Sequence, residues 1–184
     1  MAKANLDLSR ATRLLQPGCI AIVTAKYKGK ANGMTAAWVM PVSNDPPMVA
    51  LAVFPARFTH DLIQKSGELA LNIPARPLAE QVKKLGELPG EDVDKFVQTK
   101  LTLYEGKQVG APLIVECIGH LECAVVDAVR AGNHTVFIAE IVAASAEDTA
   151  FDGERWTLAD EEVKPLHHLG ANVYAVLDEP ITVP

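Results

Sequence analysis

The chain has 184 residues, of which 49% are apolar and 22% are charged. We therefore expect one globular domain over residues 1–184 and exclude disordered, collagen-like and disulfide-scaffold classes. The 17 Lys and Arg against 23 Asp and Glu give a net charge of −6 without a basic stripe, so nucleic acid and anionic membranes are not expected partners.

The first third of the chain alternates short apolar segments with turn residues, which is typical of an antiparallel sheet. Residues 19–25 predict a strand, Gly29 a turn, and the extended pattern that resumes at 36–39 is broken by two prolines at 46–47. Residues 48–54 predict the next strand. Its two faces differ mainly in side-chain size, so we expect it to be covered on both sides.

Three short helices and a strand fit the middle of the chain. Thr59 is the expected N-cap of a helix that ends at Gly67. A second helix is predicted from Pro77 to Gly86, and a third over 91–97. Residues 69–73 predict a strand between the first two helices.

Residues 116–145 predict a long hairpin. Strands over 121–129 and 135–143 flank the loop Ala131-Gly132-Asn133, whose residues tolerate positive φ. The antiparallel turn, together with the absence of a GxGxxG or GxxxxGK[ST] motif, argues against a parallel doubly wound sheet. We expect a mainly β fold, a closed or partly closed antiparallel β-barrel with peripheral short helices.

Targeting and metal-binding signals are weak. The first residues lack the apolar core of a signal peptide, and no apolar run approaches the roughly 18 residues that span a bilayer, so we expect a cytoplasmic protein without a membrane segment. The three cysteines have no CxxC spacing and are expected to be buried thiols. None of the five histidines shows HExxH or zinc-cluster spacing, so no metal site is expected.

The segment around Arg57 and Thr59 is the first candidate binding site. The start of a helix offers unpaired N–H groups and a partial positive charge, which suit a phosphate. Arg57 adds a charged guanidinium group, and Thr59 adds a hydroxyl at the same place. The simpler interpretation is an ordinary N-cap beside a solvated arginine, and Asp61 in the first turn favours it.

The second candidate is a stretch of small and polar residues, Asn32-Gly33-Met34-Thr35-Ala36-Ala37-Trp38. Its small side chains would let a flat ring lie against the backbone, and its threonine offers a hydroxyl. The simpler interpretation is a strand with a glycine bulge, whose small residues pack in a narrow barrel.

His134 is the third candidate, because it lies beside the predicted hairpin turn, and loops at a barrel mouth often carry function. The alternative is a solvated turn histidine. His167 and His168 would face opposite sides of a strand, so packing or surface roles are expected for them. Glu116 and Glu122 would share a strand face, but we interpret both as solvated.

Taken in order, these segments resemble the flavin reductase-like family of FMN-binding split-barrel proteins, of the flavoredoxin type, over nearly the whole chain. The segments that carry the resemblance are 32–38, 41–43, 45–47, 57–59, 67–74, 92–96, 121–123, 132–134 and 169–174. The resemblance implies a Greek-key antiparallel split barrel, usually a homodimer with flavin near the interface.

The resemblance also implies roles for individual residues. The stretch 32–38, with Ser43 and Asn72 nearby, would lie against the isoalloxazine ring, and Arg57 and Thr59 would hold the FMN phosphate.

Two further roles follow from the same resemblance. It implies contact of Lys95 or Tyr174 with flavin across the dimer, and it places His134 as the catalytic histidine beside a nicotinamide. The family often has Gly-Asp-His where this chain has Asn133, which lacks the carboxylate that would orient or charge the histidine.

The leading hypothesis is an FMN-binding oxidoreductase in which NAD(P)H reduces the flavin and a separate acceptor takes the electrons. The cofactor carries the difficult step, which accounts for the absence of a catalytic motif. The first alternative is a flavoredoxin-like electron carrier without NAD(P)H activity of its own, which docks with a protein redox partner. The second is a non-redox barrel that binds another flat anionic ligand or serves as an interaction module.

Overall fold

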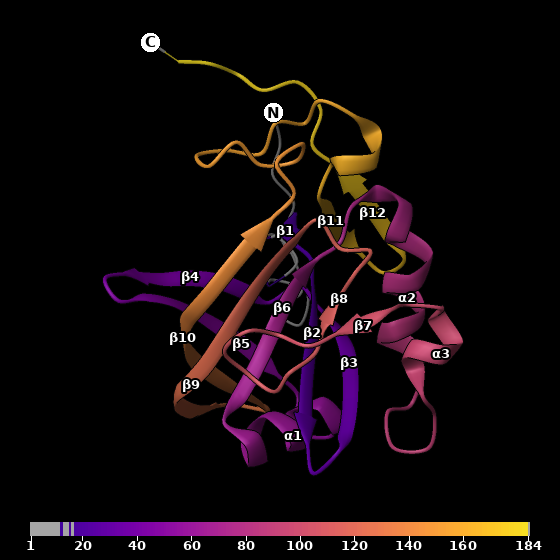
Figure 1. The fold of residues 1–184 in the computed structure, drawn as a ribbon, viewed down its shortest axis with the longest axis vertical. Coiled ribbons are helices and arrows are strands. Elements are labelled where there is room, and N and C mark those ends of the chain that lie inside the picture. The colour runs from indigo at the N-terminus through magenta and orange to yellow at the C-terminus, as the bar shows by residue number, and fades with distance from the viewer. Residues whose placement is uncertain (1–11, 13–14, 16, 184) are drawn as a thin grey trace, which may run out of the picture.

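The structure is a computed structural model that describes residues 12, 15 and 17–183. Its largest element is a seven-stranded antiparallel sheet, drawn in Figure 1. In spatial order the strands are β3 (Lys30–Ala36), β2 (Ala21–Tyr27), β6 (Glu68–Ile73), β9 (Gly119–Ala131), β10 (His134–Ala146), β5 (Pro47–Val53) and β4 (Val39–Asn44). This confirms the predicted mainly β, antiparallel fold and the long hairpin, which is β9–β10.

The two edge strands of this sheet are consecutive in the sequence. β3 ends at Ala36 and β4 begins at Val39, so only Ala37 and Trp38 connect opposite edges. At about 4.8 Å per strand, a flat sheet would hold its edges about 29 Å apart, whereas three Cα steps span at most about 11 Å. The sheet therefore curls into a barrel whose edges approach each other at this corner.

Short helices surround the barrel, as expected, and two smaller sheets lie beside it as well. One sheet pairs β1 (Gly18–Cys19), β11 (Leu166–Gly170) and β12 (Val173–Val176), and another pairs β7 (Leu103–Tyr104) with β8 (Leu113–Ile114). The helices are α1 (Phe58–Ser66), α2 (Ala79–Glu87) and α3 (Lys95–Thr99), with 3₁₀ turns η2 (Arg76–Leu78) and η3 (Glu161–Val163).

Strand β2 separates two hydrophobic cores. On one face Val23 packs inside the barrel in a cluster that includes Leu51 and Phe137. On the other face Ile22 belongs to a cluster with Val82 of α2 and Leu166 of β11. The barrel thus carries α2 and the small C-terminal sheet on its outer surface, where they can wall a cavity.

Strand β5 meets the expectation of two covered faces along only part of its length. Its larger side chains, among them Leu51 and Val53, are fully buried in the barrel. On the opposite face Ala50 is buried, but Ala52 is only half-buried, and Phe54, just beyond the strand, is 43% exposed. At Ala52 and Phe54 that face borders a cavity instead of a second packed layer.

The predicted start of the first helix is wrong by two residues. Arg57 is the N-cap of α1, and no side chain caps the helix. Thr59 cannot serve as the cap because it lies within the helix, where its Oγ1 accepts a hydrogen bond of 2.8 Å from Asn32 Nδ2. The predicted end is confirmed, since Gly67 adopts the left-handed conformation with φ of 72°.

The other two helices are shifted toward the C-terminus relative to prediction, since α2 spans Ala79–Glu87 and α3 spans Lys95–Thr99. α2 continues through Gly86, which packs near Thr35, and ends after Glu87. α3 starts at Lys95, four residues later than predicted, because the Asp94 carboxylate accepts the backbone N–H groups of the first turn.

Two predictions about side-chain exposure, those for Glu122 and Cys19, are wrong. Glu122 is 4% exposed, and its carboxylate accepts backbone N–H groups of residues 107–109 at 2.7 to 3.0 Å. The loop that supplies these groups crosses the strand from elsewhere in the chain. Cys19 is exposed instead of buried, whereas Cys117 and Cys123 are buried as expected.

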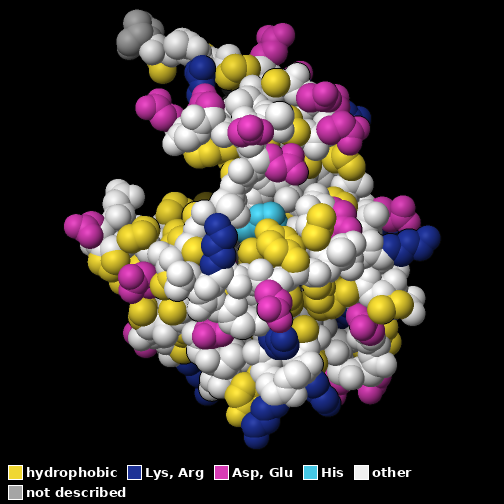
Figure 2. All heavy atoms as spheres, viewed as in Figure 1, with side chains coloured by type: hydrophobic (Ala, Val, Ile, Leu, Met, Phe, Trp, Pro, Cys, Tyr) yellow, Lys and Arg dark blue, Asp and Glu magenta, His cyan; other side chains and the backbone are white. Residues whose placement is uncertain are grey.

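The surface carries charges of both signs (Figure 2). On the face in Figure 2, acidic and basic side chains are interspersed and form no broad basic area. Within the described part of the chain, no helix combines the length and apolar character needed to cross a membrane. The same residues contain no cluster of three or more His, Cys, Asp or Glu arranged to hold a metal ion.

Candidate functional site

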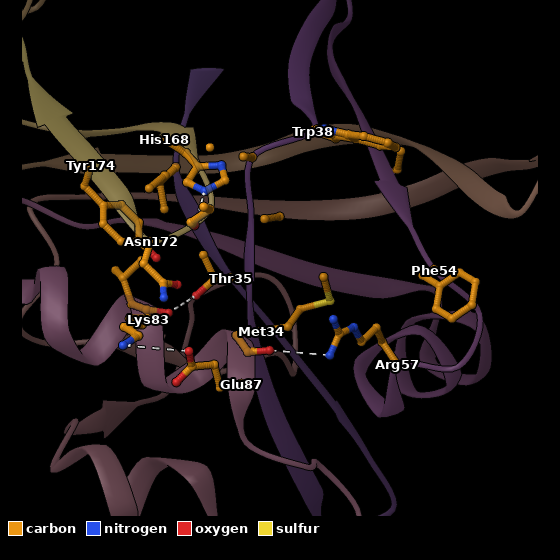
Figure 3. A pocket seen from close by; sticks show the side chains of 18 of the residues that line it. Met34, Thr35, Trp38, Phe54, Arg57, Lys83, Glu87, His168, Asn172 and Tyr174 are labelled. Carbon is orange, nitrogen blue, oxygen red and sulfur yellow. Dashed lines mark hydrogen bonds and ion pairs between the residues drawn. The ribbon is translucent and has the colours of Figure 1, made fainter. Parts of the chain in front are cut away.

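A cavity of about 660 Å³ lies at the corner where β3 passes into β4. Its walls come from the segment 34–38, the adjacent ends of β5 and β10, helix α2, and the β11–β12 hairpin. In Figure 3, Trp38 and Phe54 lie on one side of this space, and His168, Asn172 and Tyr174 on the other. A volume of this size is typical of sites for small molecules and cofactors.

One end of this cavity, which we call the aromatic end, consists of Trp38, Phe54 and His134. The His134 ring centroid is 4.9 Å from that of Trp38 and 5.7 Å from that of Phe54, with tilted planes. Trp38 is 48% exposed although it is large and apolar. Exposed aromatic surface beside a cavity is well suited to contact a planar ligand.

Strand β3 has two different faces along this wall. Gly33 lies on the face toward α3, where an added Cβ would come within 2.9 Å of the Phe96 ring. Its missing side chain therefore makes room for Phe96 and leaves no surface for a flat ligand. Met34, on the opposite face, lines the cavity.

A second, smaller cavity of about 200 Å³ adjoins the first and shares Met34 and Arg57 with it. Asn32, Thr59 and Lys95 also line it. We call this group, with Arg57, the cationic end. The uncapped first turn of α1 lies at the same cavity, so unpaired backbone N–H groups and two cationic side chains occur together.

Lys95 is unusual for a lysine because it is only 4% exposed. Its Nζ donates a hydrogen bond of 2.8 Å to the Leu85 carbonyl at the end of α2. Burial, and secondarily the charge of Arg57, lower the pKa of Lys95 to about 8. Glu91 and Asp92 line the same cavity and supply negative charge nearby.

The structure distributes the predicted site residues over three places. Met34, Thr35, Ala36, Ala37, Trp38, Arg57 and His134 line the larger cavity, and Asn32, Thr59 and Lys95 line the smaller one. Gly33, Ser43 and Asn72 line neither cavity.

Asn72 is fully buried in contacts within the fold. Its Nδ2 donates to the Ile22 carbonyl and to Thr24 Oγ1, and its Oδ1 accepts the Ile114 N–H at 2.9 Å. These bonds hold β2 and β8 to β6. Ser43 lies in β4, at a register irregularity of its pairing with β5.

Several lining residues were missed by sequence reasoning. They are Phe54, Lys83, Glu87, His168 and Asn172. His168 stacks on Tyr174 with centroids 5.5 Å apart, and Tyr174 lines a cavity of its own chain. The pairing of β1 with β11 brings this late segment to the site. The sequence pointed to this segment only through the family resemblance, which included residues 169–174.

A sequence model of the family described as "Flavin reductase like domain" matches residues 15–172. The chain belongs to this family. An uncharacterized protein of Aeropyrum pernix is 37% identical over 171 residues, covering 90% of this chain; the chain spans 62% of that relative's length. An NADH-dependent FAD reductase of Streptomyces globisporus is 30% identical, covering 67% of this chain and 70% of the reductase.

Solved structures also resemble the chain over its full length. An FMN-binding protein from Thermus thermophilus with bound p-hydroxybenzaldehyde has a TM-score of 0.85 at 23% identity, covering 100% of this chain and 99% of that chain, and shows the shared fold. A flavoredoxin from Methanosarcina acetivorans has a TM-score of 0.81 at 26% identity, covering 100% and 93%.

Proposed function

We propose that this flavin reductase-like protein is an oxidoreductase that binds FMN across its two cavities. The observation that carries the proposal is that the two cavities meet at Met34 and Arg57. The larger is walled by aromatic and small side chains, and the smaller is cationic. FMN has the matching division into a planar ring and a phosphate.

The cationic end fits a phosphate. Lys95 is buried and donates to the Leu85 carbonyl, a bond that uses one of the three N–H donors of its ammonium. Arg57 makes one long hydrogen bond of 3.4 Å, to the Gly86 carbonyl, which a phosphate oxygen would readily replace. The uncapped first turn of α1 adds backbone N–H donors. A pocket of about 200 Å³ suits a single phosphate.

The larger cavity fits the ring. Ala36 and Ala37 leave room along the strand, and Trp38 and Phe54 offer apolar surface that would exclude water from one side. Bound FMN supplies the ability to accept a hydride and later release electrons. Trp38 and Phe54 would restrict solvent access, and His134 would contact the molecule that approaches the ring.

We further propose NAD(P)H as the electron donor and a separate molecule as the acceptor. The 30% identity to an NADH-dependent FAD reductase supports this assignment. Asn172 and Tyr174 on the wall opposite the aromatic end leave space for a second molecule in a cavity of about 660 Å³.

A visible spectrum of the purified protein, before and after FMN is added, tests flavin binding. We expect a perturbed flavin spectrum and saturable binding. Anaerobic addition of NADH or NADPH should then bleach the flavin rapidly. Bleaching only after a partner reductase is added would support the flavoredoxin-like carrier instead. A protein that leaves the FMN spectrum unchanged would contradict both forms of the proposal.

We also propose a homodimer that covers the apolar surface beside the cavity. β4 is an edge strand, and its Met40 and Val42 are 60% and 43% exposed, next to the exposed Trp38. Exposed apolar edge strands favour pairing with another chain. We expect twice the monomer mass in sedimentation analysis. Met40→Lys should shift the protein toward monomer, and a monomeric wild-type protein would contradict the proposal.

A further inference from the structure

The turn between β9 and β10 fixes the orientation of His134. Gly132 adopts a left-handed conformation with φ of 61°, and the chain reverses at Gly132 and Asn133. The His134 ring then packs against Trp38 and Phe54, with centroids 4.9 and 5.7 Å away. These two ring contacts restrict rotation of the imidazole before any ligand arrives.

The exposed Asn133 side chain lies within hydrogen-bond distance of one ring nitrogen of His134. His134 Nδ1 lies 2.7 Å from Asn133 Oδ1. An amide oxygen has no hydrogen and can only accept, so Nδ1 must be the donor. A neutral imidazole carries one N–H, which leaves Nε2 with a lone pair.

We propose that Asn133 is a positioning residue that holds neutral His134 in the Nδ1–H tautomer, so that Nε2 serves the cavity as a hydrogen-bond acceptor. The family resemblance implied that Asn133 lacks a carboxylate that would orient or charge the histidine. The 2.7 Å contact separates the two, because the amide oxygen retains the orienting bond without adding a negative charge.

The proposal defines the chemistry that His134 recognises. A ligand held by Nε2 must present an N–H or O–H group, whereas a bare carbonyl or carboxylate finds no donor there. Resting on the proposed function, this favours a carboxamide N–H₂, as in reduced nicotinamide, beside the Trp38 and Phe54 rings. Asn133 would then help to select the electron donor although it does not touch it.

The tautomer can be measured without flavin, by two-bond proton–nitrogen NMR correlations of the histidine rings. His134→Ala identifies the signal by its loss. We expect the Nδ1–H pattern for wild type. Asn133→Asp keeps an accepting oxygen and should retain the pattern, whereas Asn133→Ala should shift it toward the Nε2–H form. An Nε2–H pattern in wild type, with the amide N–H₂ donating to Nδ1, would overturn the proposal.

A kinetic comparison tests the recognition step. The reduced acetylpyridine analogue of NADH replaces the carboxamide N–H₂ by a methyl group and so lacks the donor. The kcat/KM preference for NADH over this analogue should fall about 2- to 12-fold in Asn133→Ala and recover in Asn133→Asp, in line with one hydrogen bond. An equal preference in all three proteins would overturn the assignment. Failure of the protein to bind flavin would instead contradict the proposed function and leave the NMR result intact.

Discussion

The aromatic end and the cationic end of the site meet at Arg57, yet they are built from different elements. Trp38, Phe54 and His134 come from turns at the ends of strands, and Trp38 and Phe54 are nearly half exposed. The cationic end combines the starts of α1 and α3 with Asn32 of β3, and Lys95, Asn32 and Thr59 there are at least 95% buried. One end presents partly exposed ring surface, and the other presents buried charge.

This difference predicts that the two ends contribute differently to FMN binding. Hydrogen bonds to charged groups are stronger than ring contacts at a partly exposed surface. We therefore expect the cationic end to supply most of the affinity for FMN and the aromatic end to control access to the ring. Riboflavin, which has the ring but no phosphate, separates the two contributions.

The largest expected effect is that of Arg57→Ala. Loss of one charged hydrogen bond, about 1.5–3 kcal/mol, corresponds to FMN binding weakened about 10- to 150-fold. Riboflavin affinity should change little. Fluorescence titration measures both, and Arg155→Ala, which removes an exposed arginine paired with Asp152, is the matched control. Unchanged FMN affinity would remove Arg57 from the site.

Trp38→Ala should have a smaller and less selective effect. An aromatic pair contributes about 0.5–1.5 kcal/mol beyond area burial, so FMN and riboflavin should both bind about 2- to 12-fold more weakly. Trp38→Phe should retain most of the affinity. A loss confined to FMN would mean that the ring does not lie at the aromatic end.

The pH dependence of FMN binding should come mainly from Lys95. In the free protein its pKa is lowered to about 8, so the side chain is charged below that pH and neutral above it. A bound phosphate stabilises the ammonium and raises its pKa, so binding takes up a proton above pH 8. FMN affinity should be level below about pH 8 and fall above it, by at most about tenfold per pH unit.

Titrations of FMN between pH 7 and 9 measure this slope, with the FMN phosphate already doubly ionised. Lys95→Met should weaken FMN binding and remove the slope, while riboflavin serves as the control for titration of the ring. A slope that persists in Lys95→Met would assign the dependence to another group.

The order of strands and turns was accessible from the sequence because it depends on local chemistry. Gly67 and Gly132 have positive φ; Gly67 ends α1 where predicted, and Gly132 lies in the predicted turn, although β9 continues two residues past its predicted end, to Ala131. Positions fixed by distant contacts were not accessible. Glu122 looked solvated because nothing local indicates that residues 107–109 cover it, and Thr59 looked like a cap because its partner Asn32 lies 27 residues earlier.

The candidate site shows the same limit. Residue type drew attention to Arg57 and the stretch 32–38, but it did not distinguish Gly33, which makes room for Phe96, from Met34, which lines the cavity. His168 and Asn172 were missed because they reach the site only through the pairing of β1 with β11. Nothing in the local sequence of either strand indicates that β1 pairs with β11.

Substitution of Asn72 should have the smallest effect on FMN binding. Unlike Asn32, which lines the smaller cavity, Asn72 contacts only other parts of the fold. All three of its hydrogen bonds hold β6 to β2 and β8, and it lines neither cavity. Asn72→Ala leaves buried partners unsatisfied, so the free energy of unfolding in urea should fall by about 1–3 kcal/mol while FMN affinity stays within twofold. If affinity fell and stability did not, Asn72 would contact the flavin ring as the resemblance implies, and the larger cavity would have to extend through β6.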